Sequence, residues 1–118
     1  MNITCAIIDD EPLALELLEN YVSRVPFLKL TGKYTSAIEA LARIKEDGTQ
    51  LLFLDIQMPD LNGLEFSRII DSSTKVVFTT AFSEYAIESY RSQALDYLLK
   101  PINFTDFMNA ANKALKWF

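Results

Sequence analysis

Short apolar segments alternate with amphipathic ones five times along this 118-residue chain, and that alternation restricts the fold more than any other feature. Several of the apolar segments carry hydrophobic side chains at consecutive positions, which is typical of the buried strands of a parallel sheet. The expected strands cover residues 3–8, 28–34, 51–54, 75–80 and 94–99. The segments that follow each of them are expected to be helices.

Local signals mark these helices. Pro12 suits the first turn of a helix, and Ser36 with Glu39 has the spacing of a capping box before a helix that Gly48 ends. The first helix is expected to bury Leu13, Leu17, Leu18 and Tyr21, and the second Ile38, Leu41, Ala42 and Ile44. Further helices are expected at 64–70, at 84–90 and after a capping Asn103, where Phe107, Ala110, Ala111, Ala114 and Leu115 form the apolar stripe.

The alternation of strands and helices predicts an α/β fold, a doubly wound five-stranded parallel sheet covered by helices on both faces. Five units are too few for an eight-stranded barrel. The strand order 2-1-3-4-5, as in flavodoxin-like and CheY-like folds, is the common choice at this size. We expect residues 1–118 to form one domain.

The scarcity of histidine and cysteine excludes several kinds of catalytic and structural chemistry. The chain has no histidine and one cysteine, Cys5, so neither histidine catalysis nor an internal disulfide is available, and Cys5 is expected in the core. The net charge of −5 argues against direct binding of nucleic acid. No apolar run approaches the roughly 20 residues of a membrane span, and the start of the chain lacks a signal-peptide pattern. A cytoplasmic location without membrane contact is therefore expected.

Polar residues close the apolar runs. Asp9 and Asp10 follow the first, Asp55 the third, Thr80 the fourth and Lys100 the fifth. In open parallel sheets the functional site lies beyond the carboxyl ends of the strands, so these five residues are expected to meet at one edge. Alone, each has an ordinary explanation: an aspartate caps a helix or a turn, a threonine ends a strand, and a lysine is solvated.

Three carboxylates in one cleft require neutralisation. Two unit charges about 4 Å apart repel by roughly 4 kcal/mol at an effective dielectric constant near 20. Mg²⁺ removes this repulsion and takes carboxylate and phosphate oxygens, so Asp10 and Asp55 are candidate ligands, with Asp9 binding directly or through water. A carboxylate can also accept a phosphoryl group, with the Lys100 ammonium and the Thr80 hydroxyl stabilising its oxygens.

The residues singled out above lie in segments that resemble the receiver domain of bacterial two-component response regulators. The segments are IIDDEP (7–12), LLFLDIQMPDLNG (51–63), VVFTTAF (76–82) and DYLLKPI (96–102). The resemblance implies that Asp55 takes phosphate from a sensor histidine kinase and that Asp9 and Asp10 form an acidic pair for Mg²⁺, which Mn²⁺ can replace. The backbone carbonyl of Gln57 would complete the metal sphere. Such a domain catalyses only its own phosphorylation and dephosphorylation.

The resemblance also implies how the signal leaves the site. Thr80 would be the switch hydroxyl, Lys100 the phosphate-binding lysine with a cis bond to Pro101, and Tyr97 the switch aromatic. Phosphorylation would change the surface of the fourth helix, the fifth strand and the fifth helix, and dimerisation is one outcome. Candidate residues of that surface are Glu88, Arg91, Asp96 and Lys113. Phe82 and Gln57 are expected to flank the phosphoryl group, with Phe82 restricting attacking water.

The segments DDEP (9–12) and AFSEYAIESYRSQALDYLLKPI (81–102) are similar to LytTR-type transcriptional regulators. In that subfamily a DNA-binding domain follows the receiver, so this resemblance implies that DNA is contacted only through a C-terminal domain absent here. A stand-alone receiver that signals through protein contacts remains an alternative.

Three further alternatives stay open at this point. A flavin-binding flavodoxin-like domain would need a phosphate-cradling loop where this chain has Asp9, Asp10 and Glu11. An aspartate-dependent phosphatase would need a second acid/base carboxylate and a cap domain. A pseudo-receiver would lack one of the key groups, all of which are present.

Overall fold

The computed structural model describes residues 2–59, 61, 63–70, 73–81 and 94–118. Its strands are β1 (Ile3–Ile8), β2 (Leu28–Tyr34), β3 (Leu51–Asp55), β4 (Lys75–Thr80) and β5 (Asp96–Leu99). The helices within these residues are α1 (Pro12–Ser23), α2 (Ala37–Asp47), α3 (Gly63–Ile69) and α5 (Phe104–Trp117). The helix expected at 84–90 lies outside the described residues, as do Phe82, Glu88 and Arg91.

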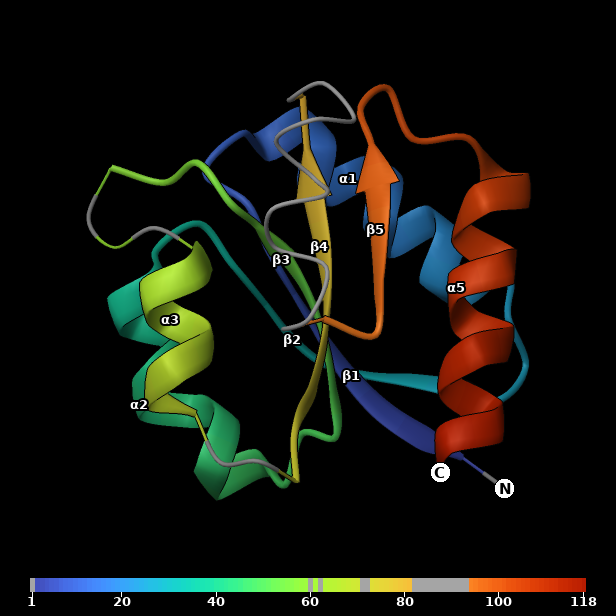
Figure 1. The fold of residues 1–118 in the computed structure, drawn as a ribbon, viewed down its shortest axis with the longest axis horizontal. Helices are drawn as coiled ribbons and strands as arrows, with labels where there is room; N and C mark the ends of the chain where they lie inside the picture. The colour runs from blue at the N-terminus through green and yellow to red at the C-terminus, as the bar shows by residue number, and fades with distance from the viewer. Residues whose placement is uncertain (1, 60, 62, 71–72, 82–93) are drawn as a thin grey trace.

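All strand pairs are parallel, and their order across the sheet is β2-β1-β3-β4-β5. Figure 1 shows α1 and α5 on one face of the sheet and α2 and α3 on the other. The predicted fold class and strand order are therefore confirmed. Within the described residues, none of the helices combines the length and hydropathy needed to cross a bilayer.

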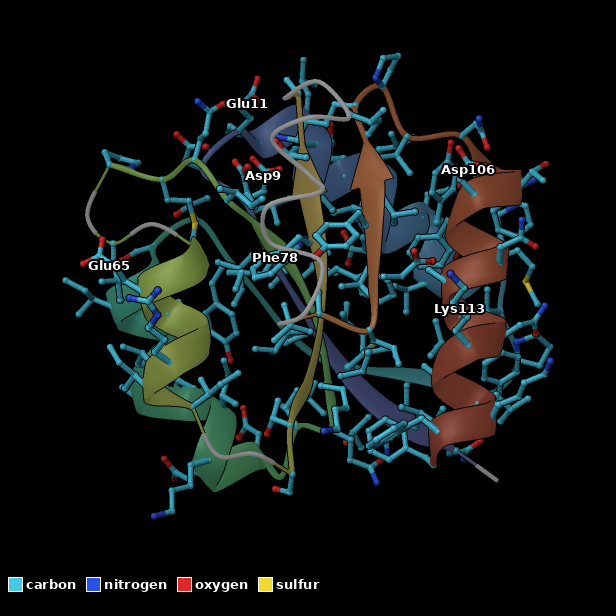
Figure 2. The ribbon with its side chains drawn as sticks, in the orientation of Figure 1. Asp9, Glu11, Glu65, Phe78, Asp106 and Lys113 are labelled. Atoms are coloured by element: carbon cyan, nitrogen blue, oxygen red, sulfur yellow. The ribbon has the colours of Figure 1, made fainter. Side chains whose placement is uncertain are left out.

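The core has two layers, one on each face of the sheet. Strand residues of one parity, such as Phe53 and Val77, pack under α1 and α5, while Leu54 and Phe78 pack under α2 and α3. Figure 2 shows the side chains around Phe78, on the face of the sheet that α2 and α3 cover. Cys5 is fully buried as expected, and burial raises the pKa of its thiol to about 12. The thiol is therefore a core group rather than a nucleophile.

Two local signals work as the sequence predicts. The Ser36 side chain accepts a hydrogen bond from the Glu39 N–H at 3.3 Å, and Asn103 accepts one from the Asp106 N–H at 2.8 Å. Gly48 ends α2 in the left-handed region, with φ of 66°. These caps fix where α2 and α5 begin and where α2 ends.

The predicted buried stripes of the first two helices are wrong in part. Leu18 is buried as predicted and Tyr21 is half-buried, but Leu13 and Leu17 are exposed, and α1 buries Leu15 and Val22 in their place. Ile38 and Ala42 are also exposed, because α2 turns Ala37, Ala40 and the correctly predicted Ile44 towards the sheet. Small alanine side chains allow close approach of the helix to the sheet, and docking of the whole helix, rather than local spacing, selects the buried face. The stripe predicted for α5 is buried except for the half-buried Leu115.

Candidate functional site

The carboxyl ends of β1, β3 and β5 deliver three charged side chains to one place. Asp9 follows β1, and its N–H donates to the Tyr34 carbonyl at 3.1 Å. Asp55 is the last residue of β3. Lys100 follows β5, and its N–H donates to the Thr80 carbonyl at 2.8 Å. Regular strand pairing thus continues to the edge of the sheet and fixes the backbone from which these side chains extend.

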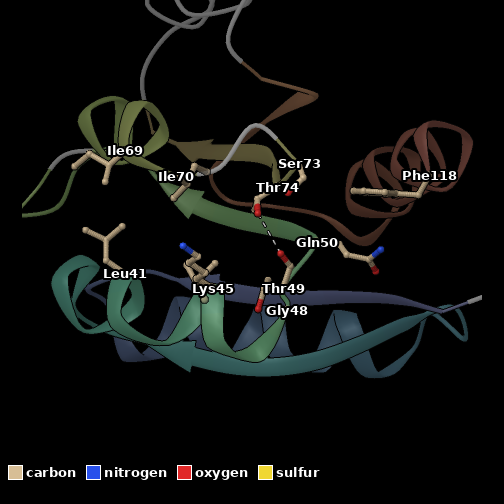
Figure 3. Close-up of a pocket in the computed structure, with 11 residues that line it drawn as sticks. Leu41, Lys45, Gly48, Thr49, Gln50, Ile69, Ile70, Ser73, Thr74 and Phe118 are labelled. Carbon is tan, nitrogen blue, oxygen red and sulfur yellow. Dashed lines mark hydrogen bonds between the residues drawn. The ribbon is translucent and has the colours of Figure 1, made fainter.

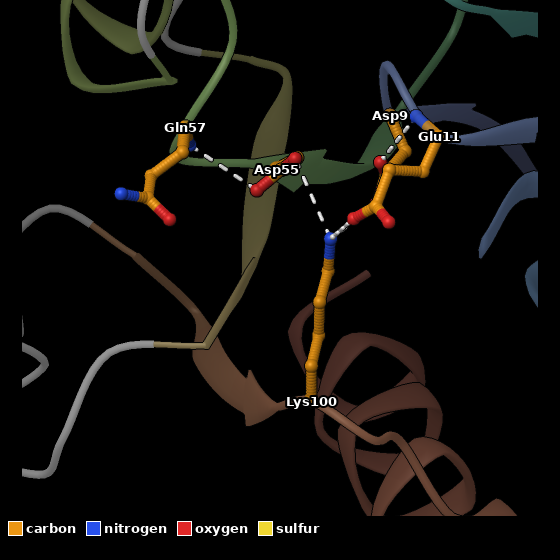
Figure 4. A network of polar contacts seen from close by, with 5 residues as sticks. All are labelled: Asp9, Glu11, Asp55, Gln57 and Lys100. Atoms are coloured by element: carbon orange, nitrogen blue, oxygen red, sulfur yellow. Dashed lines mark hydrogen bonds and ion pairs between the residues drawn. The ribbon is translucent and has the colours of Figure 1, made fainter.

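The Lys100 ammonium lies among three carboxylates (Figure 4). Its Nζ is 2.8 Å from Asp9 Oδ2, 3.4 Å from Glu11 Oε1 and 3.5 Å from Asp55 Oδ2. Asp9 is fully buried and Asp55 is 3% exposed, whereas the Glu11 side chain is 69% exposed. The strongest part of this network is therefore the contact of Lys100 with Asp9, since exposed ion pairs contribute little.

Backbone donors orient the two buried carboxylates. The Glu11 N–H donates to Asp9 Oδ1 at 2.9 Å, and the Gln57 N–H donates to Asp55 Oδ1 at 3.1 Å. Each aspartate bonds the backbone two residues ahead, as aspartates commonly do in turns. In both residues this leaves Oδ2 to face the lysine.

The electrostatics of the site follow from burial. Burial and the neighbouring Asp9 charge raise the pKa of Asp55 to about 6, although Lys100 and the Gln57 N–H act in the opposite direction. Burial lowers the pKa of Lys100, but the hydrogen bond to Asp9 and the charges of Asp55, Asp9 and Glu11 together raise it above its usual value. Lys100 therefore stays charged at neutral pH, and the site keeps an excess of negative charge.

That excess fits a divalent cation. One carboxylate oxygen each from Asp9, Asp10 and Asp55 lies within 4.8 Å of the others, with Asp10 exposed and the other two buried. Hard oxygen ligands of this kind suit Mg²⁺, which keeps several waters and so tolerates one exposed side. Relief of the repulsion between Asp9 and Asp55 would favour its binding.

Comparison with known proteins identifies the family. A family model described as the response regulator receiver domain matches residues 5–112. The chain belongs to this family. Membership favours a receiver over the flavin-binding and phosphatase alternatives.

Several relatives give the same result. A response regulatory protein from Shewanella oneidensis is 46% identical over 103 residues, which are 86% of this chain and 44% of that protein. The transcriptional regulatory protein BtsR from Escherichia coli K12 is 41% identical over 99 residues, 82% of this chain and 41% of BtsR. The chain thus spans less than half the length of these curated relatives. The signal receiver domain of the response regulator NarL from Mycobacterium tuberculosis, 26% identical, superimposes with a TM-score of 0.86 over 98% of this chain and 97% of the other.

Of the five residues predicted to converge, the structure brings Asp9, Asp10, Asp55 and Lys100 together. Thr80 is fully buried at the carboxyl end of β4. Strand pairing, however, sets Thr79 and not Thr80 beside Asp55. The sequence predicted no site role for Thr79 or for Glu11, because the position of Thr79 beside Asp55 depends on the register between β3 and β4.

The other predicted site residues do not join the cluster of Asp9, Asp10, Asp55 and Lys100 through their side chains, or lie outside the described residues. The Lys100–Pro101 peptide bond is cis. Gln57 contacts Asp55 through its N–H, and its exposed side chain turns away from Lys100 (Figure 4). The Tyr97 ring stacks on Phe78 with centroids 6.1 Å apart, and its hydroxyl is buried. Phe82, the second predicted flanking residue, lies outside the described residues.

A pocket of about 570 Å³ lies far from this network, where α2 and α3 end and where β3 and β4 begin (Figure 3). The Thr74 hydroxyl donates to the Thr49 carbonyl across it at 3.2 Å. Leu41, Ile44, Ile69, Ile70 and Phe118 make much of its lining apolar. It lies at the amino ends of the strands, at the opposite edge of the sheet from the one where open parallel sheets carry their functional sites.

Proposed function

We propose that this receiver takes a phosphoryl group from a sensor histidine kinase onto Asp55 and passes the signal to an attached DNA-binding domain. One observation carries the proposal. One oxygen of the buried Asp55 carboxylate lies within 4.8 Å of one oxygen each of Asp9 and Asp10, and Lys100 Nζ lies 3.5 Å from Asp55 Oδ2. An oxygen nucleophile, metal-binding carboxylates and a fixed cation therefore occupy one place.

The proposed step is a displacement at phosphorus. An Asp55 carboxylate oxygen forms a bond to phosphorus while the bond from phosphorus to the donor's nitrogen or oxygen breaks, and the donor leaves with the electron pair. Lys100 then neutralises charge on the phosphoryl oxygens as its contacts with Asp55 and Asp9 loosen. Mg²⁺, held by Asp10 and Asp55 with Asp9 and the Gln57 carbonyl nearby, would supply further neutralisation when bound.

The output would leave through β5 and α5. Phosphorylation adds about −1.5 to −2 charges at Asp55, and Thr80 at the end of β4 would respond to them and change the space available to Tyr97. The Tyr97 ring already packs on Phe78 in this structure. Phosphorylation would therefore change how often the ring occupies this position, and not whether the ring can reach it. An ion pair of 3.2 Å joins Asp96 on β5 to Lys113 on α5, and it would feel any shift of β5.

An output domain is supported by the relatives. They are more than twice as long as the segment matched here, and one of them, BtsR, is a transcriptional regulatory protein. Together with the segments at 9–12 and 81–102, this supports a LytTR-type regulator that acts in the cytoplasm. A homodimer formed on phosphorylation would then place two output domains on DNA.

The direct test is modification of the purified chain. Acetyl phosphate with Mg²⁺ should add one phosphoryl group by intact mass, and size-exclusion chromatography of the same sample reports dimerisation. Asp55→Asn, which keeps the shape of the side chain, should remain unmodified, as should the wild type in EDTA. A wild-type chain that takes up no phosphoryl group under these conditions contradicts the proposal.

A further inference from the structure

The row of side chains next to Asp55 contains a polar group with no assigned role. Asp55 on β3 pairs with Thr79 on β4, and Thr79 pairs with Leu98 on β5. Paired residues of parallel strands project from the same face of a sheet. Two residues earlier, Phe53 and Val77 both pack under α1 and α5, so Asp55 and Thr79 also face that side. Thr79 is thus the neighbour of the proposed phosphoacceptor along the row.

The Thr79 hydroxyl is the anomaly in this row. Thr79 is fully buried, and its Oγ1 has no hydrogen-bond partner among the described residues. A buried polar group without a partner costs about 1–3 kcal/mol. Valine has nearly the same shape and at least as high a strand propensity, and it would fill this position without that cost. The hydroxyl is therefore hard to explain as a packing group.

The Asp55 carboxylate can accept a further hydrogen bond. Its Oδ1 accepts from the Gln57 N–H at 3.1 Å, while within the described part of the chain its Oδ2 has only the long contact of 3.5 Å with Lys100. A carboxylate can accept about four hydrogen bonds in total. An incoming phosphoryl group attracts the same Lys100 ammonium that now faces Oδ2. Phosphoryl transfer therefore weakens the contact that holds the carboxylate at the step where its orientation towards phosphorus determines the rate.

We propose that Thr79 is a positioning residue for Asp55. Rotation about χ1 between staggered wells moves the hydroxyl from its unpaired position towards the carboxylate. There it donates to the Asp55 oxygen that does not bond to phosphorus, and it holds the carboxylate in line as Lys100 turns to the phosphoryl oxygens. Thr79 keeps its proton throughout, and the bonds made and broken at phosphorus are those of the proposed function, on which this inference rests.

A matched pair of variants separates the hydroxyl from the shape of the side chain. Thr79→Val keeps the shape and removes the hydroxyl, whereas Thr79→Ser keeps the hydroxyl and removes the methyl group. With acetyl phosphate and saturating Mg²⁺, the rate of modification read by intact mass should fall about tenfold in Thr79→Val, the value of one hydrogen bond to a charged group. Thr79→Ser should stay within about threefold of the wild type.

Stability gives the second readout. Urea unfolding of unmodified Thr79→Val should show a free energy of unfolding equal to or above that of the wild type, because an unpaired buried hydroxyl has been removed. A variant that folds at least as well and is modified more slowly cannot owe its defect to misfolding. If Thr79→Val does not fold, Thr79→Ala and Thr79→Ser form the equivalent pair.

The outcomes distinguish this inference from the function on which it rests. A wild-type chain without an Asp55 adduct overturns the proposed function. A wild type and a Thr79→Val variant that are modified at equal rates overturn only the role of Thr79. Equal slowing in Thr79→Val and Thr79→Ser also overturns it, because the effect would then belong to packing and not to the hydroxyl.

Discussion

Lys100 Nζ lies 2.8 Å from Asp9 Oδ2, and this pair joins the end of β5 to the end of β1 across the intervening strands β3 and β4. Asp9 is fully buried, and the Lys100 side chain is 19% exposed. The pair therefore belongs to the class in which loss of one partner leaves an uncompensated buried charge. It also makes Lys100 a competitor of any cation that Asp9 helps to bind.

Replacement of Lys100 by methionine tests this relationship. In EDTA the Lys100→Met variant should lose about 3 kcal/mol of unfolding free energy, because the Asp9 carboxylate remains buried without its partner. Added Mg²⁺ should stabilise the variant more than the wild type, since the metal replaces the missing positive charge. Urea unfolding of both proteins with and without Mg²⁺ measures the difference. An equal effect of Mg²⁺ on the two proteins would contradict competition between lysine and metal.

The raised pKa of Asp55 predicts how stability depends on pH without metal. Because the folded state holds the Asp55 proton more tightly than the unfolded state, this group stabilises the fold most at low pH. Its contribution is lost as pH rises from its ordinary value of 3.8 through about 6. The full change corresponds to about 3 kcal/mol. Asp55→Asn lacks it, so in EDTA the variant should gain stability relative to the wild type between about pH 4 and about pH 7.

The control for this pH effect is Asp106→Asn, which removes an exposed carboxylate from the first turn of α5. Its stability relative to the wild type should not show the same rise with pH. If Asp55→Asn and the wild type keep a constant difference over this range, Asp55 has no raised pKa in the folded chain.

Glu11 offers a test of charge at the mouth of the site. Its Oε1 is 3.4 Å from Lys100 Nζ, but the side chain is 69% exposed, so Glu11→Gln should change stability by less than about 0.5 kcal/mol. Removal of one negative charge should instead speed the approach of anionic acetyl phosphate about twofold at low salt. The advantage should vanish at high ionic strength.

Glu16→Gln supplies the matched control for this variant. Glu16 is exposed on α1, and the same charge is removed without any contact with Lys100. Equal acceleration by the two variants would mean that overall charge, and not the position of Glu11, governs donor approach.

The parts of the site that the sequence predicted are those that local pattern determines. Asp9, Asp55 and Lys100 stand where apolar runs end, and the ends of parallel strands share one edge of a sheet. The caps at Ser36 and Asn103 also depend only on neighbours three residues away. The pairing of Asp55 with Thr79 depends instead on the register between β3 and β4, which involves residues far apart in the chain.

The same distinction explains the error over α1. Apolar residues surround much of this helix, so the spacing Leu13–Leu17 and the spacing Leu15–Leu18–Val22 both satisfy a helical pattern. Only docking against the sheet decides between them. Leu18 is 1% exposed in the core, whereas Leu13 is 79% exposed.

This leads to a prediction with a built-in comparison. Leu18→Ala should lower the free energy of unfolding by about 3 kcal/mol, because it opens a cavity between α1 and the sheet. Leu13→Ala removes the same atoms from solvent and should change stability by less than about 0.5 kcal/mol. Urea unfolding of the two variants measures both values under one set of conditions. A loss in Leu13→Ala as large as that in Leu18→Ala would mean that Leu13 is also buried, and the docking of α1 described above would be wrong.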